Sequence, residues 1–242
     1  MVHAPQLTPR NPKTNIMIRL EKVERTFQVG DQLVTALNKV DLDIQAGEYI
    51  SIMGPSGSGK STLLNILGLL DQPTGGRYML DGKDVTSLTE DEQAHTRQQK
   101  IGFVFQFFHL IPRLTAAANI ELPMILAGIP EAERKERIHT LLKAIGLENR
   151  ADHRPAQLSG GQLQRIAIAR AAVMQPKVLL ADEPTGNLDQ HSGSEIINLL
   201  EELNGNGLTL IVVTHDINIG RRAHRHIQIV DGIISSDDKK KI

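Results

Sequence analysis

A glycine-rich run between an apolar segment and a helix-like segment is the part of the sequence best suited to chemistry. It reads Gly54-Pro55-Ser56-Gly57-Ser58-Gly59-Lys60-Ser61 and fits the pattern G-x-x-x-x-G-K-[ST]. Glycines let the backbone turn its N–H groups toward a phosphate, and the helix that starts near Ser61 adds its positive dipole end. Lys60 can reach the β- and γ-phosphates, and the Ser61 hydroxyl suits Mg²⁺. The run predicts a nucleotide-binding loop with contacts through Thr62.

Two adjacent carboxylates follow a second apolar segment and could serve the same phosphates. Residues 178–181 read as a buried strand, and Asp182 and Glu183 come directly after it. Asp182 is suited to orienting Mg²⁺ through its water shell, and Glu183 to polarising the attacking water as a general base. The alternative is a carboxylate pair that is simply solvated at a strand end. Beside a phosphate-binding loop, the catalytic interpretation is favoured.

The elements that must position these residues form an α/β pattern. Alternating or unbroken apolar segments predict strands at 18–27, 34–44, 49–53, 78–81, 101–105, 178–181, 208–213, 226–230 and 233–235. Helical spacing predicts helices at 61–70, 115–126, 131–145, 162–173 and 192–203. This order predicts a parallel core, an antiparallel N-terminal sheet and an inserted helical lobe.

Composition narrows the class of protein. The chain has 242 residues, with 27 basic and 28 acidic side chains and a net charge of -1, so nothing marks it as a nucleic-acid binder. Cysteine is absent, which excludes disulfide scaffolds and thiolate chemistry. No apolar run approaches the roughly 20 residues that span a bilayer.

A second glycine pair creates another possible anion site. The segment reads Leu158-Ser159-Gly160-Gly161-Gln162, and Ser159 can cap a helix that begins near Gln162. This segment resembles the signature of the ATP-binding cassette (ABC) ATPases. In that family two cassettes dimerise head to tail, and the signature of one caps the ATP held by the other. The resemblance implies ATP and Mg²⁺ as cofactors, a homodimer, and contact of Ser159, Gly160, Gly161 and Gln162 with the partner's ATP.

Five further residues match motifs of the same family, in order. The resemblance implies that Phe27 stacks on adenine, with a core phenylalanine as the alternative, and that Gln106 bridges Mg²⁺ and the membrane-facing lobe. Asn187 and Asp189 fall in a loop that crosses the dimer interface, and His215 contacts the γ-phosphate. With Lys60, Gln106 and Glu183, His215 completes the expected catalytic set.

The resemblance also implies the domain plan. It is that of a P-loop NTPase of the ABC type: a mixed central sheet, an antiparallel N-terminal β-subdomain and an inserted α-helical subdomain. We expect the ATPase domain at residues 17–236, with the helical subdomain at about 107–174. Residues 1–16 are expected to form a disordered leader, and residues 237–242 a flexible tail.

Residues 102–112 and 181–189 look like the lipoprotein-release and macrolide-export branch of the family. The branch departs from this chain at Leu114-Thr115-Ala116-Ala117-Ala118-Asn119, where it usually reads L-T-A-L-E-N, and at Leu163. This likeness implies membrane permease subunits as partners, a periplasmic adaptor as a candidate partner, no nucleic acid, and a peripheral location on the cytoplasmic face of the inner membrane. An exposed apolar surface for the permease is predicted at Phe107, Phe108, Leu110 and Ile111.

Other classes remain as alternatives. One is a non-transport cassette that acts in translation or DNA repair, and another is a cassette that regulates a periplasmic activity through its permease. Asn38-Lys39-Val40-Asp41 matches the guanine-reading N-K-x-D of GTPases, but it precedes the phosphate loop and alternates like an exposed strand. We interpret that match as coincidental.

Overall fold

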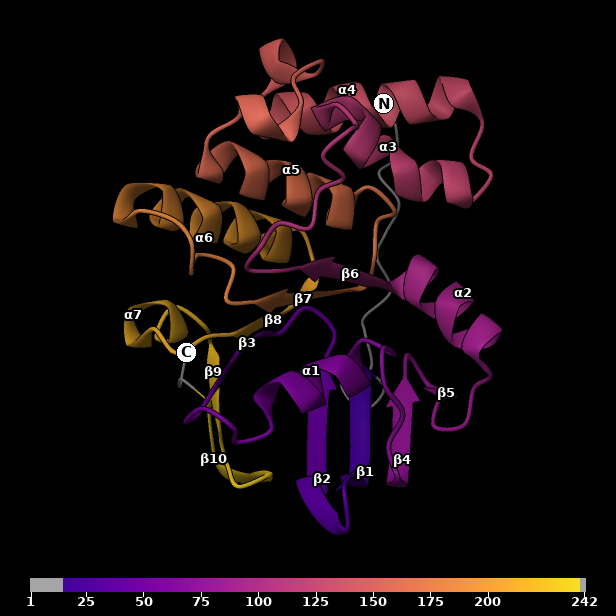
Figure 1. The fold of residues 1–242 in the computed structure, drawn as a ribbon, viewed down its shortest axis with the longest axis vertical. Helices are drawn as coiled ribbons and strands as arrows, with labels where there is room; N and C mark the ends of the chain where they lie inside the picture. The colour runs from indigo at the N-terminus through magenta and orange to yellow at the C-terminus, as the bar shows by residue number, and fades with distance from the viewer. Residues whose placement is uncertain (1–14, 240–242) are drawn as a thin grey trace, which may run out of the picture.

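Two sheets organise the chain (Figure 1). The structure is a computed structural model that describes residues 15–239, so the expected leader, apart from its last two residues, lies outside the described part. The antiparallel sheet has the order β2-β1-β4-β5, comprising β2 (Gln32–Gln45), β1 (Ile16–Val29), β4 (Gly75–Leu80) and β5 (Lys83–Asp84). This sheet is the N-terminal one that the sequence predicts, and the predicted α/β class is confirmed.

The second sheet has six strands in the order β10-β9-β3-β8-β7-β6. They are β10 (Ile233–Lys239), β9 (Arg225–Val230), β3 (Tyr49–Met53), β8 (Thr209–Val213), β7 (Val178–Asp182) and β6 (Ile101–Val104). All neighbours are parallel except the β9–β10 pair. The carboxyl ends of β3 and β7 therefore lie on one edge, which brings the phosphate loop and the two carboxylates together.

Alternate residues of the central strands face two different cores. Leu180 of β7 packs in a core between the two sheets, together with α1 (Lys60–Leu67). Leu179 packs on the opposite face with α6 (Gln190–Gly205) and with Ile168 of α5 (Gly160–Ala172). Burial on both faces accounts for the unbroken apolar strands in the sequence.

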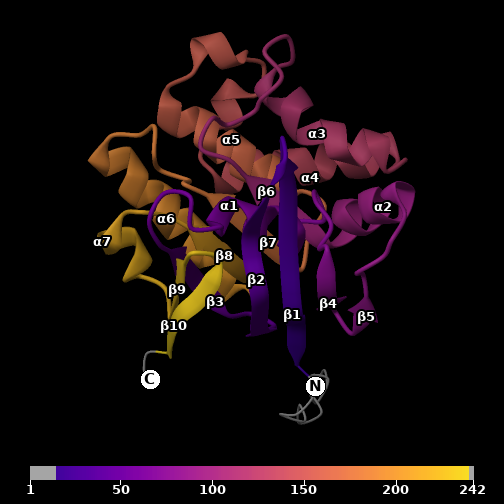
Figure 2. The same cartoon turned by 60° about the horizontal axis from the view of Figure 1, so that its bottom comes forward.

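A third core joins the helices of the lobe at the top of Figure 1. It packs α3 (Ala116–Leu126) and α4 (Glu131–Ala144) against α5. The described residues also form α2, α7 (Ile217–Gly220) and two 3₁₀ turns, Glu148–Arg150 and Pro155–Gln157, with α2 spanning Glu90–Lys100. Figure 1 and Figure 2 show α3 and α5 beyond β6 and β7, on the side away from β1 and β2.

Helix α2 has no counterpart among the elements predicted from the sequence. The sequence analysis predicts no element over α2 (Glu90–Lys100), yet this segment forms three turns that follow a capping box made by Thr89 and Glu92. Gln93 is its single buried residue, so apolar periodicity gives no signal there. The helix is stabilised by its cap, by acidic residues in the first turn and by basic residues in the last.

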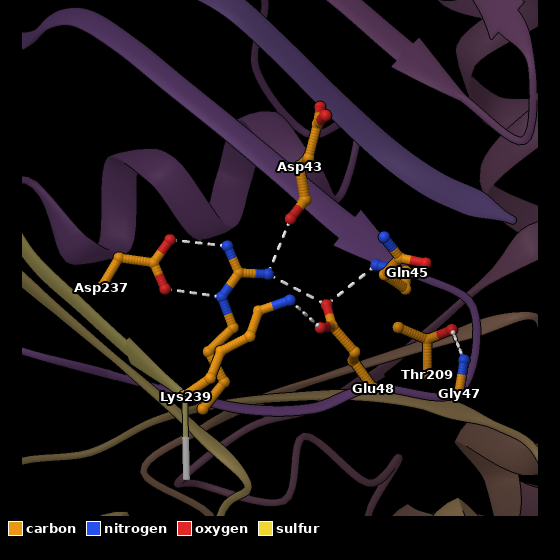
Figure 3. A network of polar contacts seen from close by, with 8 residues as sticks. Asp43, Gln45, Gly47, Glu48, Thr209, Asp237 and Lys239 are labelled. Carbon is orange, nitrogen blue, oxygen red and sulfur yellow. Dashed lines mark hydrogen bonds and ion pairs between the residues drawn. The ribbon is translucent and has the colours of Figure 1, made fainter. Parts of the chain in front are cut away.

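The expected flexible tail at 237–242 is corrected for its first three residues. Strand β10 runs through Lys239, and Asp237 accepts two hydrogen bonds of 2.6 Å from the guanidinium of Arg225. Arg225, whose side chain is 7% exposed, also donates to the carbonyl of Asp43 and to Glu48, which Lys239 contacts in turn (Figure 3). The expected tail thus begins inside a charge network that joins β2, β9, β10 and Glu48, the residue before β3.

Candidate active site

The phosphate loop has a backbone that only glycine fits at two points. Gly54 and Gly59 have positive φ angles of 152° and 103°. A Cβ atom would lie 2.1 Å from the carbonyl oxygen of Ile229 at Gly54, and 2.4 Å from that of Ala36 at Gly59. The Lys60 ammonium donates to the carbonyls of Gly54 and Pro55 at 2.9 and 2.7 Å, so the lysine folds back over the loop. The ammonium is therefore held at the loop that would surround a phosphate.

The amino end of α1 is open to an anion. Its cap, Gly59, offers no side-chain acceptor to the first N–H groups, and the first turn contains no acidic residue. Ser61 is exposed on this turn, and the buried Ser58 hydroxyl has no hydrogen-bond partner within the described chain. Unsatisfied donors at a helix start together with a nearby lysine make an anion-binding site.

The predicted carboxylates lie beside this loop. Burial, and next the charge of Glu183, raises the pKa of Asp182, whereas Lys60 opposes the shift. Asp182 ends β7, and Glu183 follows with a positive φ of 44°, which turns the chain away from the strand.

Glu183 and His215 are in direct contact. One Glu183 oxygen accepts from the His215 backbone N–H at 2.9 Å and lies 2.7 Å from the His215 Nδ1. The other oxygen accepts from the Thr214 hydroxyl at 3.1 Å. Glu183 is largely shielded, whereas His215 is 77% exposed. The expected base is thus oriented by three donors, and the histidine extends into the open site. The sequence analysis predicted no role for Thr214.

Gln106 and the loop after Glu183 are fitted to each other. A Cβ atom on Gly186 would lie 2.6 Å from the Gln106 amide nitrogen, so a larger residue would displace the Gln106 side chain from this position. Asn187 donates through its side chain to the Gln106 carbonyl at 2.9 Å. Asp189 caps α6 by accepting from Ser192, and that hydrogen bond lowers the pKa of Asp189. The predicted interface loop is thereby fixed at both of its ends.

A buried amide that the sequence reasoning missed links these two loops. Gln164 of α5 donates to the carbonyl of Pro184 at 2.8 Å and to that of Phe105 at 3.3 Å. Its own oxygen is buried without a partner in the described chain. Gln164 thus bridges the residue before Gln106 and the residue after Glu183. A polar residue among the buried positions of an amphipathic helix was the signal available in the sequence.

The signature segment forms the cap that its sequence predicts. The Ser159 hydroxyl accepts from the Gln162 N–H, and the Gln162 side chain accepts from the Ser159 N–H. The helix begins at Gly160, two residues earlier than expected. Gly160 and Gly161 lie against Leu188 and Ser192 of the same chain. However, α5 and α1 pack on opposite faces of the six-stranded sheet (Figure 1), so the two candidate anion sites are carried by helices of different layers.

Phe27 lies near the end of β1, and its partner there is Val34 of β2. The guanidinium carbon of Arg25 lies 4.4 Å from the centroid of the Phe27 ring, and Arg25 is itself paired with Asp71 at 2.7 Å. A cation on one ring face leaves the other face for stacking. The ring is partly exposed, which argues against the core alternative.

The apolar surface expected at Phe107, Phe108, Leu110 and Ile111 is divided by the structure. Phe107 is 67% exposed and Ile111 38% exposed, but Leu110 packs against the core of the lobe. Phe108 is half-buried and has a positive φ. The reason is that the chain after Gln106 turns sharply instead of running as an extended segment. The structure thus exposes Phe107 and Ile111 but packs Leu110 into the lobe, and the permease contact of these four residues stays a prediction.

A cavity of about 650 Å³ lies close by and is lined by other residues. Its apolar wall includes Phe103 and Phe105, whose rings stack with centroids 5.4 Å apart, and Leu122 and Leu126 of α3. We call this cavity the interlobe groove, because its lining comes from α2 and β6 on one side and from α3 and α5 on the other.

These features define a P-loop nucleotide hydrolase with a second candidate anion site at the start of another helix. A family model described as "ABC transporter" matches residues 37–186. The chain is 50% identical over 218 residues to the uncharacterized ABC transporter ATP-binding protein YknY of Bacillus subtilis, a match that covers 90% of this chain and 95% of the relative. The chain belongs to the ABC transporter family, as an ATP-binding cassette, and in this family ATP hydrolysis is coupled to transport.

Two other comparisons concern a longer relative and a similar solved structure. It is 54% identical over 225 residues to the macrolide export ATP-binding/permease protein MacB of Brucella abortus, which covers 93% of this chain but 35% of the relative. The chain thus spans about a third of the length of the first curated relatives it matches. Its structure is similar to a dimeric post-hydrolysis state of the cassette MJ0796 bound to ADP and Pi, with a TM-score of 0.86, 47% identity, and coverage of 93% and 100% of the two chains. No helix among residues 15–239 is both long and apolar enough to cross a membrane.

Proposed function

We propose that two copies of this chain bind ATP between them and that hydrolysis drives a membrane permease. The observation that carries this proposal is the presence of two anion-binding helix starts, on α1 and α5, in helices that pack on opposite faces of one sheet. A phosphate held at Lys60 of one copy would meet Ser159 of the second copy. The dimeric structure of the similar cassette supports a homodimer.

In this dimer, each ATP would lie between Gly57–Thr62 of one copy and Ser159–Gln162 of the other. Phe27 would stack on the adenine, while Asn187 and Asp189 would lie at the interface between copies. Glu183 would accept a proton from the attacking water, and His215 and Lys60 would stabilise charge on the γ-phosphoryl group.

The donor set fits Mg²⁺. Ser61, Gln106 and Asp182 would supply hydroxyl, amide and carboxylate oxygens, which are hard ligands of the kind that Mg²⁺ prefers. No group of three or more His, Cys, Asp or Glu side chains within residues 15–239 is placed to hold a metal by itself. Such a site suits an ion that keeps waters and shares phosphate oxygens. When bound, Mg²⁺ would neutralise charge on the β- and γ-phosphates.

Complementation between two inactive variants tests the shared site. Lys60→Ala disables the phosphate loop, and Gly161→Asp puts a negative charge at the second anion site. Each variant alone should be inactive. If the sites are shared between copies, a mixed dimer keeps one intact site, so an equal mixture should recover about a quarter of wild-type turnover. If each chain forms its own complete site, mixing restores nothing and the proposal fails.

The interlobe groove is the better candidate for the permease contact, since its apolar wall is concave whereas the residues 107–111 are divided. It suits a short helix laid into a groove. Leu126 lies at its rim and is 73% exposed, which is nearly the exposure of Leu33, at 74%, in the β1–β2 hairpin. Leu126→Glu should prevent recruitment to membranes that carry the permease, because the charge must be desolvated on docking. Leu33→Glu is the matched control, and equal loss with both variants would argue against the groove.

The likeness to macrolide-export proteins supports an export or mechanotransmission system of the lipoprotein-release and macrolide-export type. In such a system this chain would lie peripherally on the cytoplasmic face of the inner membrane, and a periplasmic adaptor would be a further partner of the complex. Purification of the membrane complex, with identification of the co-purifying permease and adaptor, tests both assignments.

A further inference from the structure

The guanidinium of Arg25 contacts two groups that belong to different parts of the nucleotide site. Its central carbon lies 4.4 Å from the centroid of the Phe27 ring, which is two residues further along β1. The same guanidinium is paired with the carboxylate of Asp71, in the segment that follows α1. Arg25 therefore joins the ring that would stack on adenine to the chain leaving the phosphate-loop helix.

The contact between Arg25 and Asp71 is a two-pronged ion pair. The Arg25 Nε donates to one carboxylate oxygen at 2.8 Å, and Nη2 lies 2.7 Å from the other. The two side chains are 22% and 23% exposed, so water screens this pair less than it screens a surface pair. A planar guanidinium held through two nitrogens has little freedom to rotate. The plane that Arg25 presents to Phe27 is thus fixed by Asp71.

The backbone on both sides of Arg25 is bonded to the same segment. The main-chain N–H of Thr74 donates to the carbonyl of Glu24 at 2.8 Å. The hydroxyl oxygen of Thr74 accepts from the main-chain N–H of Thr26 at 3.1 Å. The segment after α1 therefore holds β1 at this point through main-chain bonds as well as through the ion pair.

The pairing of β1 with β2 is irregular at Arg25. Arg25 pairs with Leu37 and Thr26 with Thr35, which leaves Ala36 as an extra residue on β2. A bulge of this kind interrupts the ladder of hydrogen bonds and bends the strand. Phe27 lies just beyond this irregularity and is partly exposed. Its orientation therefore depends more on the contact with Arg25 than it would in a regular, buried ladder.

We propose that Arg25, clamped by Asp71, is a positioning residue that holds the Phe27 ring ready to stack on the base of the nucleotide. This inference rests on the proposed stacking of Phe27 on adenine. The cation lies against one face of the ring, and the base would take the other. Because Asp71 follows the helix whose start would bind the phosphates, the pair also fixes the spacing between the base and phosphate subsites. Such preorganisation reduces the entropy lost on binding.

A double-mutant cycle on the full chain tests the proposal, with the affinity for ADP in the presence of Mg²⁺ measured by isothermal titration calorimetry. Arg25→Gln and Phe27→Leu should each weaken ADP binding about three- to tenfold. In the Phe27→Leu background, Arg25→Gln should cause no further loss, because the ring through which it acts is gone. Asp71→Asn should weaken binding in the same direction, since the guanidinium loses its clamp.

A matched control is available on the same strand. Arg19 lies toward the other end of β1 and forms a two-pronged pair with Asp43, with donor–acceptor distances of 2.9 and 3.0 Å. Arg19→Gln removes an arginine and an ion pair of the same kind away from Phe27, and it should leave the ADP affinity at the wild-type value.

Fluorescence reports the orientation of the ring directly. The chain has no tryptophan, so Phe27→Trp introduces a single indole at this position. Without nucleotide, the indole anisotropy should be lower when Arg25→Gln is added to Phe27→Trp, because the ring gains freedom when the cation is lost. Lifetimes measured on the same samples separate this motion from quenching. Unchanged anisotropy would contradict the positioning role.

The outcomes separate this inference from the proposed function on which it rests. If Phe27→Leu binds ADP like wild type, the stacking itself is wrong. If Phe27→Leu weakens binding but Arg25→Gln does not, the stacking stands and the role of Arg25 is refuted. Additive losses in the double variant would show that Arg25 supports the fold rather than the ring. Circular dichroism checks folding, and if Arg25→Gln does not fold, the cycle is run under the same criteria with Arg25→Lys, which loses the planar fork.

Discussion

Replacing Gln164 with leucine tests whether the two loops of the active site are held together through one buried amide. Gln164 donates to the carbonyls of Phe105 and Pro184, which precede Gln106 and follow Glu183 respectively. Leucine is similar in volume and favours a helix, so the packing of α5 should survive. The substitution therefore removes the bridge with little other change.

The effect on stability should be moderate. Losing two hydrogen bonds costs about 1–3 kcal/mol at roughly 0.5–1.5 kcal/mol each. The wild-type amide oxygen is buried without a partner in the described chain, and its removal recovers a cost of about 1–3 kcal/mol. The buried Pro184 carbonyl is also left without its donor, which costs about 1–3 kcal/mol, so the free energy of unfolding should fall by roughly 1–3 kcal/mol.

Catalysis should change while the protein stays folded. Without the bridge, the segment that carries Gln106 is no longer tied to the strand end that carries Glu183. We expect kcat to fall at least about tenfold, equivalent to about 1.4 kcal/mol in the barrier, while the ATP affinity of the Lys60 loop is preserved. Gln32→Leu, at an exposed position of β2, is the control. A folded Gln164→Leu protein with wild-type kcat would refute the role assigned to this amide.

Three further substitutions have defined outcomes. Lys60→Ala should weaken ATP binding about ten- to hundredfold, since it removes a charged hydrogen bond to phosphate, and unchanged affinity by calorimetry would remove Lys60 from the site. Phe27→Leu should weaken ATP binding about three- to tenfold through lost stacking, with equal affinity pointing to a structural ring. Hydrogen bonds from Arg225 lower the pKa of Asp237, so its stabilising contribution is full above the unfolded pKa of about 3.9 and is lost as pH falls through the folded pKa. Urea unfolding of Asp237→Asn should show reduced stability at pH 7 with a smaller loss on acidification, and a curve parallel to wild type would contradict this sign.

The nucleotide site was largely readable from the sequence because its chemistry depends on local order. The glycines, Lys60 and Ser61 are consecutive, and an apolar strand before them determines which way the loop faces. The cap at Ser159 is also a local feature, since its partner is three residues away. In each case one short segment contains both the residues and the physical reason for their conformation.

The features that the sequence did not predict depend mostly on contacts between distant segments. Gln164 and Arg170 bond to carbonyls about sixty positions away, 59 to Phe105 and 62 to Phe108, and main-chain acceptors leave no signature in the sequence. The division of the surface at Phe107–Ile111 has the same origin: Leu110 turns inward because Phe108 and His109 adopt left-handed backbone angles. Helix α2 was missed for the opposite reason, as it is stabilised by its cap and charges with almost no buried face.

Helix α5 connects three regions of the molecule: the signature at Ser159, the two loops bridged by Gln164 and the interlobe groove. The 13 residues of α5 span about 20 Å. At its start Ser159 and the two glycines face the proposed partner copy, in its middle Gln164 holds both catalytic loops, and near its end Arg170 lines the interlobe groove. A helix of this length moves as a rigid body, since bending it would break its own hydrogen bonds. Closure of the dimer on ATP therefore cannot displace the signature without also moving Gln164 and Arg170, and a partner seated in the interlobe groove must act on the catalytic loops through the same helix.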